Sequence, residues 1–259
     1  MMKQMKRTII ATMLLTSSNI YAVVDSNVSS NNGLSQEFFQ RQVNQNMSVG
    51  RAVKSIVSHY PEHVESVVAT ALDLYPDRYK EIVHAAISAE PSLTKSIVRV
   101  AIEKGITSCP NIVETAINAE PSYVDFVVKA AANTTPGELQ DIVRVAVVTE
   151  PDSADRIVQT LAQSHPNKLI EIVGTAIGAV PFVGEYIVDA MLAVFHEEKE
   201  QGDVLTTAFR QSSDESEYIK KIIASAKNAG MGDEAITQYA VNAGAKPEDV
   251  VRLLKETEN

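Results

Sequence analysis

The chain has 259 residues, of which 45% are hydrophobic and only 5% aromatic, and its formal net charge is −10. A chain of this length can bury a sizeable apolar core, while its negative charge disfavours nucleic acid and anionic membrane surfaces as partners. The single cysteine, Cys109, excludes an internal disulfide framework.

Residues 1–22 have the pattern of a secretory signal peptide, with a basic start, an apolar run over residues 8–15 and a small residue, Ala22, at the cleavage position. The basic residues are Lys3, Lys6 and Arg7. We therefore expect cleavage after Ala22 and export to the periplasm or to the outside of the cell. Cleavage leaves 20 basic against 33 acidic residues, so the net charge becomes −13.

Residues 23–45 are predicted to be a disordered leader, because residues 23–33 are rich in Ser and Asn. Within this leader, residues 34–45 can form a short helix with Phe38 and Phe39 on one side. The sequence thus predicts one candidate helix before the main body of the chain.

Residues 46–195 are dominated by a repeat of 15 residues. From Pro61 to Phe195 the unit occurs nine times, and apolar residues at its positions 4, 7, 8, 11 and 12 form the stripe of an amphipathic helix. The eighth position is valine in every copy: Val68, Val83, Val98, Val113, Val128, Val143, Val158, Val173 and Val188. The pattern predicts one short helix in each unit, with this valine at the centre of the core.

Each helix is predicted to run from about position 3 to position 13, with an N-cap side chain at position 2 and the proline outside the helix. The rival interpretation is one long helix that is kinked at each proline. It is rejected because a 15-residue period rotates the apolar face by roughly 60° per unit, so the stripe would wind around the helix. Separate short helices cannot stand alone and must stack on one another.

A second period of 30 residues pairs the helices, because Ala-Glu-Pro or Thr-Glu-Pro recurs at Pro91, Pro121 and Pro151. The fold class predicted is all-α, an α-solenoid of short helices of about 11 residues that pair into 30-residue hairpins, followed by a small C-terminal helical module. Residues 46–60 lack the proline but keep the apolar positions, which indicates an atypical N-terminal unit that caps the array.

The unit that begins at Ile106 departs from the pattern. It has no proline at its first position, and Pro110 appears four residues later. Since proline is tolerated in a first helical turn, we expect this helix to start late, after a looser turn at Gly105.

Residues 177–195 carry few charges, so we expect another part of the chain to cover them. They are not predicted to span a membrane, because Pro181, Glu185 and Asp189 interrupt the apolar run. Residues 196–203 are predicted to be a charged linker. Residues 204–259 are predicted to form a helical module that folds back as a lid over the apolar end of the array. Its helices are expected near residues 203–210, 214–228, 233–242 and 247–255.

Catalytic and metal-binding patterns are weak. His59 and His63 have the spacing of a zinc pair, but Pro61 lies between them, so surface histidines are the favoured interpretation. Cys109 falls at an apolar position of its unit, which favours a buried, inert thiol over a nucleophile. No nucleophile elbow, phosphate loop or metal-ligand cluster occurs, so we predict no enzyme activity, no cofactor and no metal.

Three aromatic residues lie off the core stripe, at positions 3 and 6 of their units: Tyr123, Phe126 and Tyr186. They can anchor a partner, since aromatic side chains dominate binding hot spots, or they can pack against an adjacent hairpin. The sequence leaves these two alternatives open.

Three glutamates precede prolines at the 30-residue spacing and are expected to lie on one edge of the stack: Glu90, Glu120 and Glu150. They could form an acidic stripe for a basic partner or a weak Ca²⁺ site. The favoured interpretation is turn chemistry, because carboxylates near the start of a helix interact well with its dipole.

A regular surface without a catalytic motif favours a protein- or peptide-binding scaffold, with no nucleic-acid partner and no transmembrane span. The alternative is a structural, surface or matrix component of the adhesion type, whose copies associate end to end. An envelope hydrolase is disfavoured, because it would need a pocket of convergent polar side chains that the sequence does not indicate.

Overall fold

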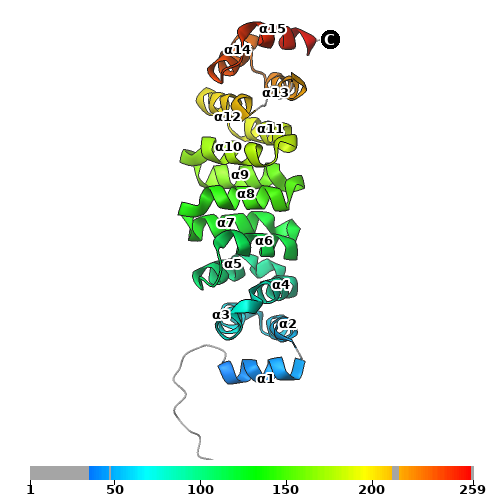
Figure 1. The fold of residues 1–259 in the computed structure, drawn as a ribbon, viewed down its shortest axis with the longest axis vertical. Helices are drawn as coiled ribbons and strands as arrows, with labels where there is room; N and C mark the ends of the chain where they lie inside the picture. Colours follow the sequence, from blue (N-terminus) through cyan, green and yellow to red (C-terminus); the bar gives the residue numbers. More distant parts are fainter. Residues whose placement is uncertain (1–34, 47, 212–215, 258–259) are drawn as a thin grey trace, which may run out of the picture. The chain divides into compact units, whose positions relative to one another are not determined.

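The structure is a computed structural model that describes residues 35–257 apart from residues 47 and 212–215. The predicted signal peptide and residues 23–34 of the predicted leader lie outside the described residues. Within the described part, the chain forms fifteen α-helices and eight short 3₁₀ helices, and no strand (Figure 1). The all-α class predicted from the sequence is confirmed.

The helices that follow α1 are short and regularly spaced up to α11, as the 15-residue unit predicts. The first eight are α1 Gln36–Asn46, α2 Val49–His59, α3 Val64–Leu74, α4 Tyr79–Ala89, α5 Thr94–Glu103, α6 Cys109–Ala119, α7 Val124–Thr134 and α8 Leu139–Thr149. The others are α9 Ala154–Ser164, α10 Leu169–Ala179, α11 Gly184–Val194, α12 Glu198–Gln211, α13 Ser216–Asn228, α14 Asp233–Asn242 and α15 Pro247–Glu256.

The described helices stack in two rows (Figure 1). The even-numbered helices α2 to α14 pack on one another in one row, and the odd-numbered helices α1 to α15 pack in the other. Each helix also packs against its chain neighbours in the opposite row. We call these the even row and the odd row. Two helices therefore make one layer, and the α-solenoid of hairpins predicted from the 30-residue period is confirmed.

Successive helices of one row are parallel and in register, because their contacts join residues 31 positions apart. Lys104 Nζ lies 2.6 Å from Asp73 Oδ2, which links the C-terminal ends of α5 and α3. In the even row, the backbone N–H of Gly50 donates to Glu81 Oε1 at 2.8 Å, which links α2 to α4. Each contact thus joins one position of the unit to the next position of the unit that lies one hairpin further along the row.

The core lies between the two rows and is made by the predicted apolar stripe. All nine valines of the eighth position have no exposed surface, so the prediction for this column is confirmed. Alanine at position 11, as at Ala71 and Ala131, is also fully buried. Such small side chains allow the helices of the two rows to approach one another closely.

The turns differ from the expectation. Each proline at the first position of a unit begins a three-residue 3₁₀ helix that runs directly into the α-helix, so these α-helices start at position 4 rather than position 3. The 3₁₀ helices are η1 Pro61–His63, η2 Pro76–Arg78, η3 Pro91–Leu93, η4 Pro121–Tyr123, η5 Pro136–Glu138, η6 Pro151–Ser153, η7 Pro166–Lys168 and η8 Pro181–Val183. The prediction of an N-cap at position 2 is wrong, because that residue already lies inside the 3₁₀ turn.

The residue before each proline closes both helices that meet there. Tyr75 N donates to Ala71 O at 2.9 Å, the last bond of α3, while Tyr75 O accepts from Arg78 N at 3.0 Å, the first bond of η2. Tyr75 has φ −137° and ψ 60°, outside the α region, as steric conflict with the following proline requires. One residue therefore links the end of the α-helix to the 3₁₀ helix that follows.

The unit that begins at Ile106 has the looser turn that the sequence predicts, but its α-helix starts at position 4, as the α-helices of the other units do. Gly105 has φ 63°, a left-handed conformation that glycine adopts without strain, and it ends the turn after α5. The helix α6 then starts at Cys109 without a leading 3₁₀ turn, and Pro110 lies in its first turn.

The predicted charged linker is largely helical, because α12 begins at Glu198. Glu198 and Glu200 lie in its first turn, where acidic side chains favour the start of a helix. Four helices, α12 to α15, occupy the C-terminal part, but they do not fold back as a lid. Instead α12 packs on α10, α13 on α11 and α14 on α12, so the two rows simply continue.

Two glycine–tyrosine contacts join the C-terminal helices to the array and to one another. A Cβ atom at Gly184 of α11 would lie 2.0 Å from Tyr218 Oη of α13, and one at Gly202 of α12 would lie 2.4 Å from Tyr239 Cε1 of α14. Burial raises the pKa of Tyr218 to about 12. The rings of Tyr218 and Tyr239 occupy the space that a side chain at Gly184 or Gly202 would need.

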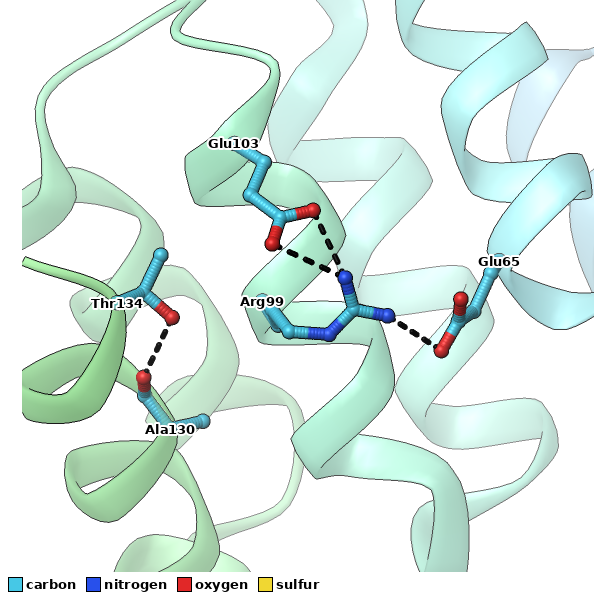
Figure 2. A network of polar contacts seen from close by, with 5 residues as sticks. All are labelled: Glu65, Arg99, Glu103, Ala130 and Thr134. Atoms are coloured by element: carbon cyan, nitrogen blue, oxygen red, sulfur yellow. Dashed lines mark hydrogen bonds and ion pairs between the residues drawn. The ribbon is translucent and has the colours of Figure 1, made fainter.

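An ion-pair network joins α3 and α5 on the odd row (Figure 2). Arg99 donates to Glu103 Oε2 at 2.8 Å on its own helix and lies 2.5 Å from Glu65 Oε1 on α3. The hydrogen bond from Arg99 holds the pKa of Glu65 below its ordinary value. These side chains are substantially exposed, so the network contributes at most about 1 kcal/mol.

Candidate functional site

The six residues predicted to bind a partner all lie at one edge of the stack, where even-row helices turn into odd-row helices. Glu90, Glu120 and Glu150 are the residues that follow α4, α6 and α8, which are consecutive members of the even row. The aromatic residues occupy the starts of odd-row helices at the same edge, with Tyr123 in η4, Phe126 in α7 and Tyr186 in α11. The structure therefore brings together residues that the sequence offered as two separate sets.

The aromatic side chains face outward rather than into a neighbouring hairpin. Phe126 is 52% exposed and Tyr186 is 62% exposed, whereas Tyr123 is half-buried. The rings of Tyr123 and Phe126 pack against each other, with their centroids 5.4 Å apart. Position 6 lies opposite the core stripe on the helix, because two positions after position 4 the helix has turned by about 200°.

Phe182 belongs to this surface and was missed as a site residue. It lies in η8, four residues before Tyr186, and is 74% exposed. Phe182 occupies position 2 of its unit, which is polar or glycine in the other proline units. This departure from the pattern could have identified Phe182 as an exposed aromatic residue. We call Tyr123, Phe126, Phe182 and Tyr186 the aromatic edge.

The helix α9 separates the two halves of the aromatic edge and presents charged side chains between them. Arg156 Nη2 lies 3.2 Å from Asp125 Oδ2 and so bridges α9 to α7. A hollow of about 600 Å³ beside Phe126 lies between α7 and α9, and one of about 280 Å³ beside Tyr186 lies between α9 and α11. Asp152 and Asp155 line the second hollow. Phe126 and Tyr186 thus each border a depression that polar side chains line in part.

Turn chemistry accounts for two of the three glutamates. Ser92 Oγ donates to Glu90 Oε1 at 2.6 Å, and Ser122 Oγ donates to Glu120 Oε1 at 2.5 Å. Each bond links the cap residue to position 2 of the 3₁₀ turn that follows. Glu150 has Asp152 at that position, which cannot donate at neutral pH. One carboxylate oxygen of Glu90 and one of Glu120 therefore accept a hydrogen bond within their own turn.

Cys109 is buried at the start of α6, where Thr135 Oγ1 donates to its Sγ at 3.2 Å. Burial raises the pKa of this thiol, with the Thr135 hydrogen bond acting in the opposite direction. A thiol that is protonated and covered has little nucleophilic character. The expectation of a buried thiol is confirmed.

His59 and His63 are exposed and lie on either side of the turn at Pro61. His59 Nδ1 lies 2.7 Å from Ser55 O, within its own helix, and His63 Nε2 lies 3.8 Å from Glu62 Oε1. Among the described residues, no group of three His, Cys, Asp or Glu side chains is placed to hold a metal ion.

The apolar residues of α10 and α11 raise the question of a membrane span, and the bend between the two helices bears on it. Within the described ranges no single helix is long and apolar enough to cross a membrane; Pro166–Ala179 and Pro181–Val194 satisfy that test together, but they are bent by 116°.

The fold defines the protein as an α-solenoid of short helical hairpins. No protein-family model matches the chain, and no curated protein matches its sequence.

Proposed function

We propose that the protein is an exported, non-enzymatic scaffold that binds a protein or peptide through the aromatic edge. The observation that carries this proposal is the exposure of Phe126, Phe182 and Tyr186 on alternate helices of one row. Large aromatic side chains that are left open on a regular surface are typical of interaction sites. Export rests on the signal pattern of residues 1–22, and an intact mass that still includes these residues in protein from the native cells would refute it.

The charges around the aromatic edge favour a basic or amphipathic partner. Asp125 pairs with Arg156, Glu185 pairs with Lys221, and Lys129 lines the hollow beside Phe126. Asp152 and Asp155 line the hollow beside Tyr186, and no ion pair joins either of them to a cation of the described residues. A cationic side chain of the partner can stack on the face of Tyr186 while the nearby carboxylates neutralise its charge. Aromatic anchors supply most of the affinity in such a surface, and charges supply orientation.

The test is affinity capture from the native cell envelope with wild-type protein and with the variant Phe126→Ala/Tyr186→Ala. We expect the variant to lose the captured partner, with affinity lower on the order of tenfold or more once the partner is purified. The matched control is Val148→Ala/Ile170→Ala, which removes exposed apolar side chains from the even row. Equal capture by all three proteins would contradict a role for the aromatic edge.

A second candidate function is end-to-end self-association as a structural or surface component. A groove of about 490 Å³ between α14 and α15 favours it, because the half-exposed side chains of Val241 and Val251 line the groove. Light scattering after size exclusion, over a wide concentration range, separates the two functions. Assemblies that grow with concentration and disappear in Val241→Lys/Val251→Lys support self-association, while a monomer at all concentrations excludes it.

A further inference from the structure

A groove on the outer face of the even row crosses α2, α4 and α6 and has a volume of about 620 Å³. Small residues make its floor, with Gly50 on α2, Ala85 on α4 and Thr115 on α6 at positions 5 or 10 of their units. We call it the basic groove, for the side chains of its walls. It shares no residue with the aromatic edge and lies on the opposite row.

Three cations line the basic groove without an acidic partner. Arg51 and Lys54 of α2 and Lys80 of α4 are exposed, and no ion pair joins any of them to a carboxylate of the described residues. Elsewhere in the array, cations such as Arg99, Lys104 and Arg156 are paired with carboxylates. Unpaired cations of two neighbouring helices therefore converge on one hollow.

The carboxylate at the centre of the groove is already neutralised. Glu81 Oε1 accepts the backbone N–H of Gly50 at 2.8 Å, and Oε2 pairs with Arg78 of the same helix. The contact with α2 depends on glycine, because a Cβ at Gly50 would lie 2.6 Å from Glu81 Cγ. Since Glu81 is occupied on both sides, it does not cancel the charge of Arg51, Lys54 and Lys80.

We propose that the basic groove binds an extended acidic peptide segment of a partner protein. Helices that pack 8–10 Å apart place the outer walls of α2 and α6 roughly 20 Å apart, which an extended chain covers with about six residues at about 3.3 Å each. Carboxylates of the segment pair with Lys54 and Lys80, while its backbone lies over the small residues of the floor. The basic groove is locally positive although the whole chain has a net charge of −10, and an acidic partner complements this local charge.

A peptide fits this groove better than a nucleic acid or a sulfated polysaccharide. Glu114 lines the end of the groove on α6 together with Asn118, and both can accept hydrogen bonds from the backbone N–H groups of a peptide. A continuous polyanion would instead meet the Glu114 carboxylate and the negative charge of the whole chain. The groove therefore selects a segment in which carboxylates alternate with neutral groups.

The experiment measures fluorescence anisotropy of a labelled octapeptide of alternating glutamate and serine, titrated with the purified full-length protein at low salt. We expect saturable binding that weakens with added salt. Lys54→Glu/Lys80→Glu is expected to weaken binding on the order of tenfold or more, because it both removes two attractions and adds two repulsions. Lys54→Arg/Lys80→Arg is expected to retain it.

The matched control is Lys95→Glu/Lys246→Glu, which changes the net charge by the same amount at two exposed lysines outside the groove. It should alter binding by less than about twofold, since exposed charges far from the ligand are screened. Four results would overturn the proposal: no binding by the wild type, equal loss in the control, equal or tighter binding of an octathymidylate or a heparin fragment, or self-association that Lys54→Glu/Lys80→Glu abolishes. None of them depends on the aromatic edge, so each leaves the scaffold proposal to its own test.

Discussion

Valine at the eighth position of every unit is the residue on which the packing of the array depends. Its branched side chain has one strongly preferred rotamer in a helix, which costs a little helix propensity but gives a rigid wedge. At Val128 this side chain is fully buried between the two rows, and Ala131 beside it is equally buried. Pairing a stiff side chain with a small one allows close approach of the helices without a void.

Val128→Asp should destabilise the protein by about 3–5 kcal/mol, because it places an unpaired charge in the core. Val148→Asp is the matched control on the next helix of the chain, since Val148 is 58% exposed. It should change the free energy of unfolding by no more than about 0.5 kcal/mol. Denaturant unfolding followed by circular dichroism measures both, and similar midpoints for the two variants would show that the valine column is not in the core.

The core residues could be predicted from the sequence because a helical stripe is a local pattern. Phe182 was missed because exposure of an apolar residue depends on where the turn ends and the helix begins. The basic groove was missed because Lys54 and Lys80 are far apart in the chain. The 30-residue period could have indicated this groove. Arg51 and Lys54 lie 30 residues before Glu81 and His84, so the period places their helices side by side in one row.

At the scale of the helices, the turn at each proline explains why capping was predicted wrongly. Side chains such as Ser122 and Asp152 at position 2 have the chemistry of N-caps. They cannot act as caps, because the 3₁₀ helix that starts at the proline already includes them. The chain instead uses the backbone of the preceding residue, which is compatible with any side chain and explains why that position varies from Tyr75 to Glu120.

The packing of α13 on α11 depends on a glycine, as the packing of α14 on α12 does. Tyr218 Oη is buried without a hydrogen-bond partner among the described residues, so the ring is held by shape rather than by its hydroxyl. Gly184 supplies the space that the ring needs. These contacts take the place of the proline units, which end with α11.

Gly184→Ala should destabilise the protein by about 1–3 kcal/mol, because the added methyl group would overlap the Tyr218 ring. The matched control is Gly137→Ala, where a Cβ would meet no atom within 4 Å. It is expected to be neutral or slightly stabilising, since alanine loses less backbone entropy on folding. Thermal melts compare the two, and Tyr218→Phe should recover part of the loss at Gly184. Equal melting temperatures for the two alanine variants would contradict the contact.

At the scale of the described chain, the C-terminal helices extend the two rows instead of covering them from outside. The sequence predicted four helices there but not their placement, because their pattern no longer carries the 15-residue unit. Contacts between α10 and α12 show where the C-terminal helices lie. A Cβ atom at Gly174 of α10 would lie 3.3 Å from Thr207 Cγ2 of α12. These helices still cover the apolar end of the array, but as its next layers.

Deletion of residues 196–259 should therefore expose the faces of α10 and α11 that now contact α12 and α13. We expect the shortened protein to associate in a concentration-dependent way, because large exposed apolar surfaces drive aggregation and solenoids need polar terminal layers. Light scattering after size exclusion measures this. A shortened protein that stays monomeric at every concentration would show that α12 to α15 are dispensable for solubility.

Contacts such as Lys104 with Asp73 join helices that are two apart in the chain, so successive helices belong alternately to the even row and the odd row. Duplication or loss of a whole hairpin during evolution would leave every downstream helix in its own row, with its outward residues on the same side. Gain or loss of a single unit would exchange the rows beyond that point and carry Phe126 and Tyr186 to the side that now holds the basic groove. Only changes by whole hairpins would therefore keep the aromatic edge and the basic groove on their present rows.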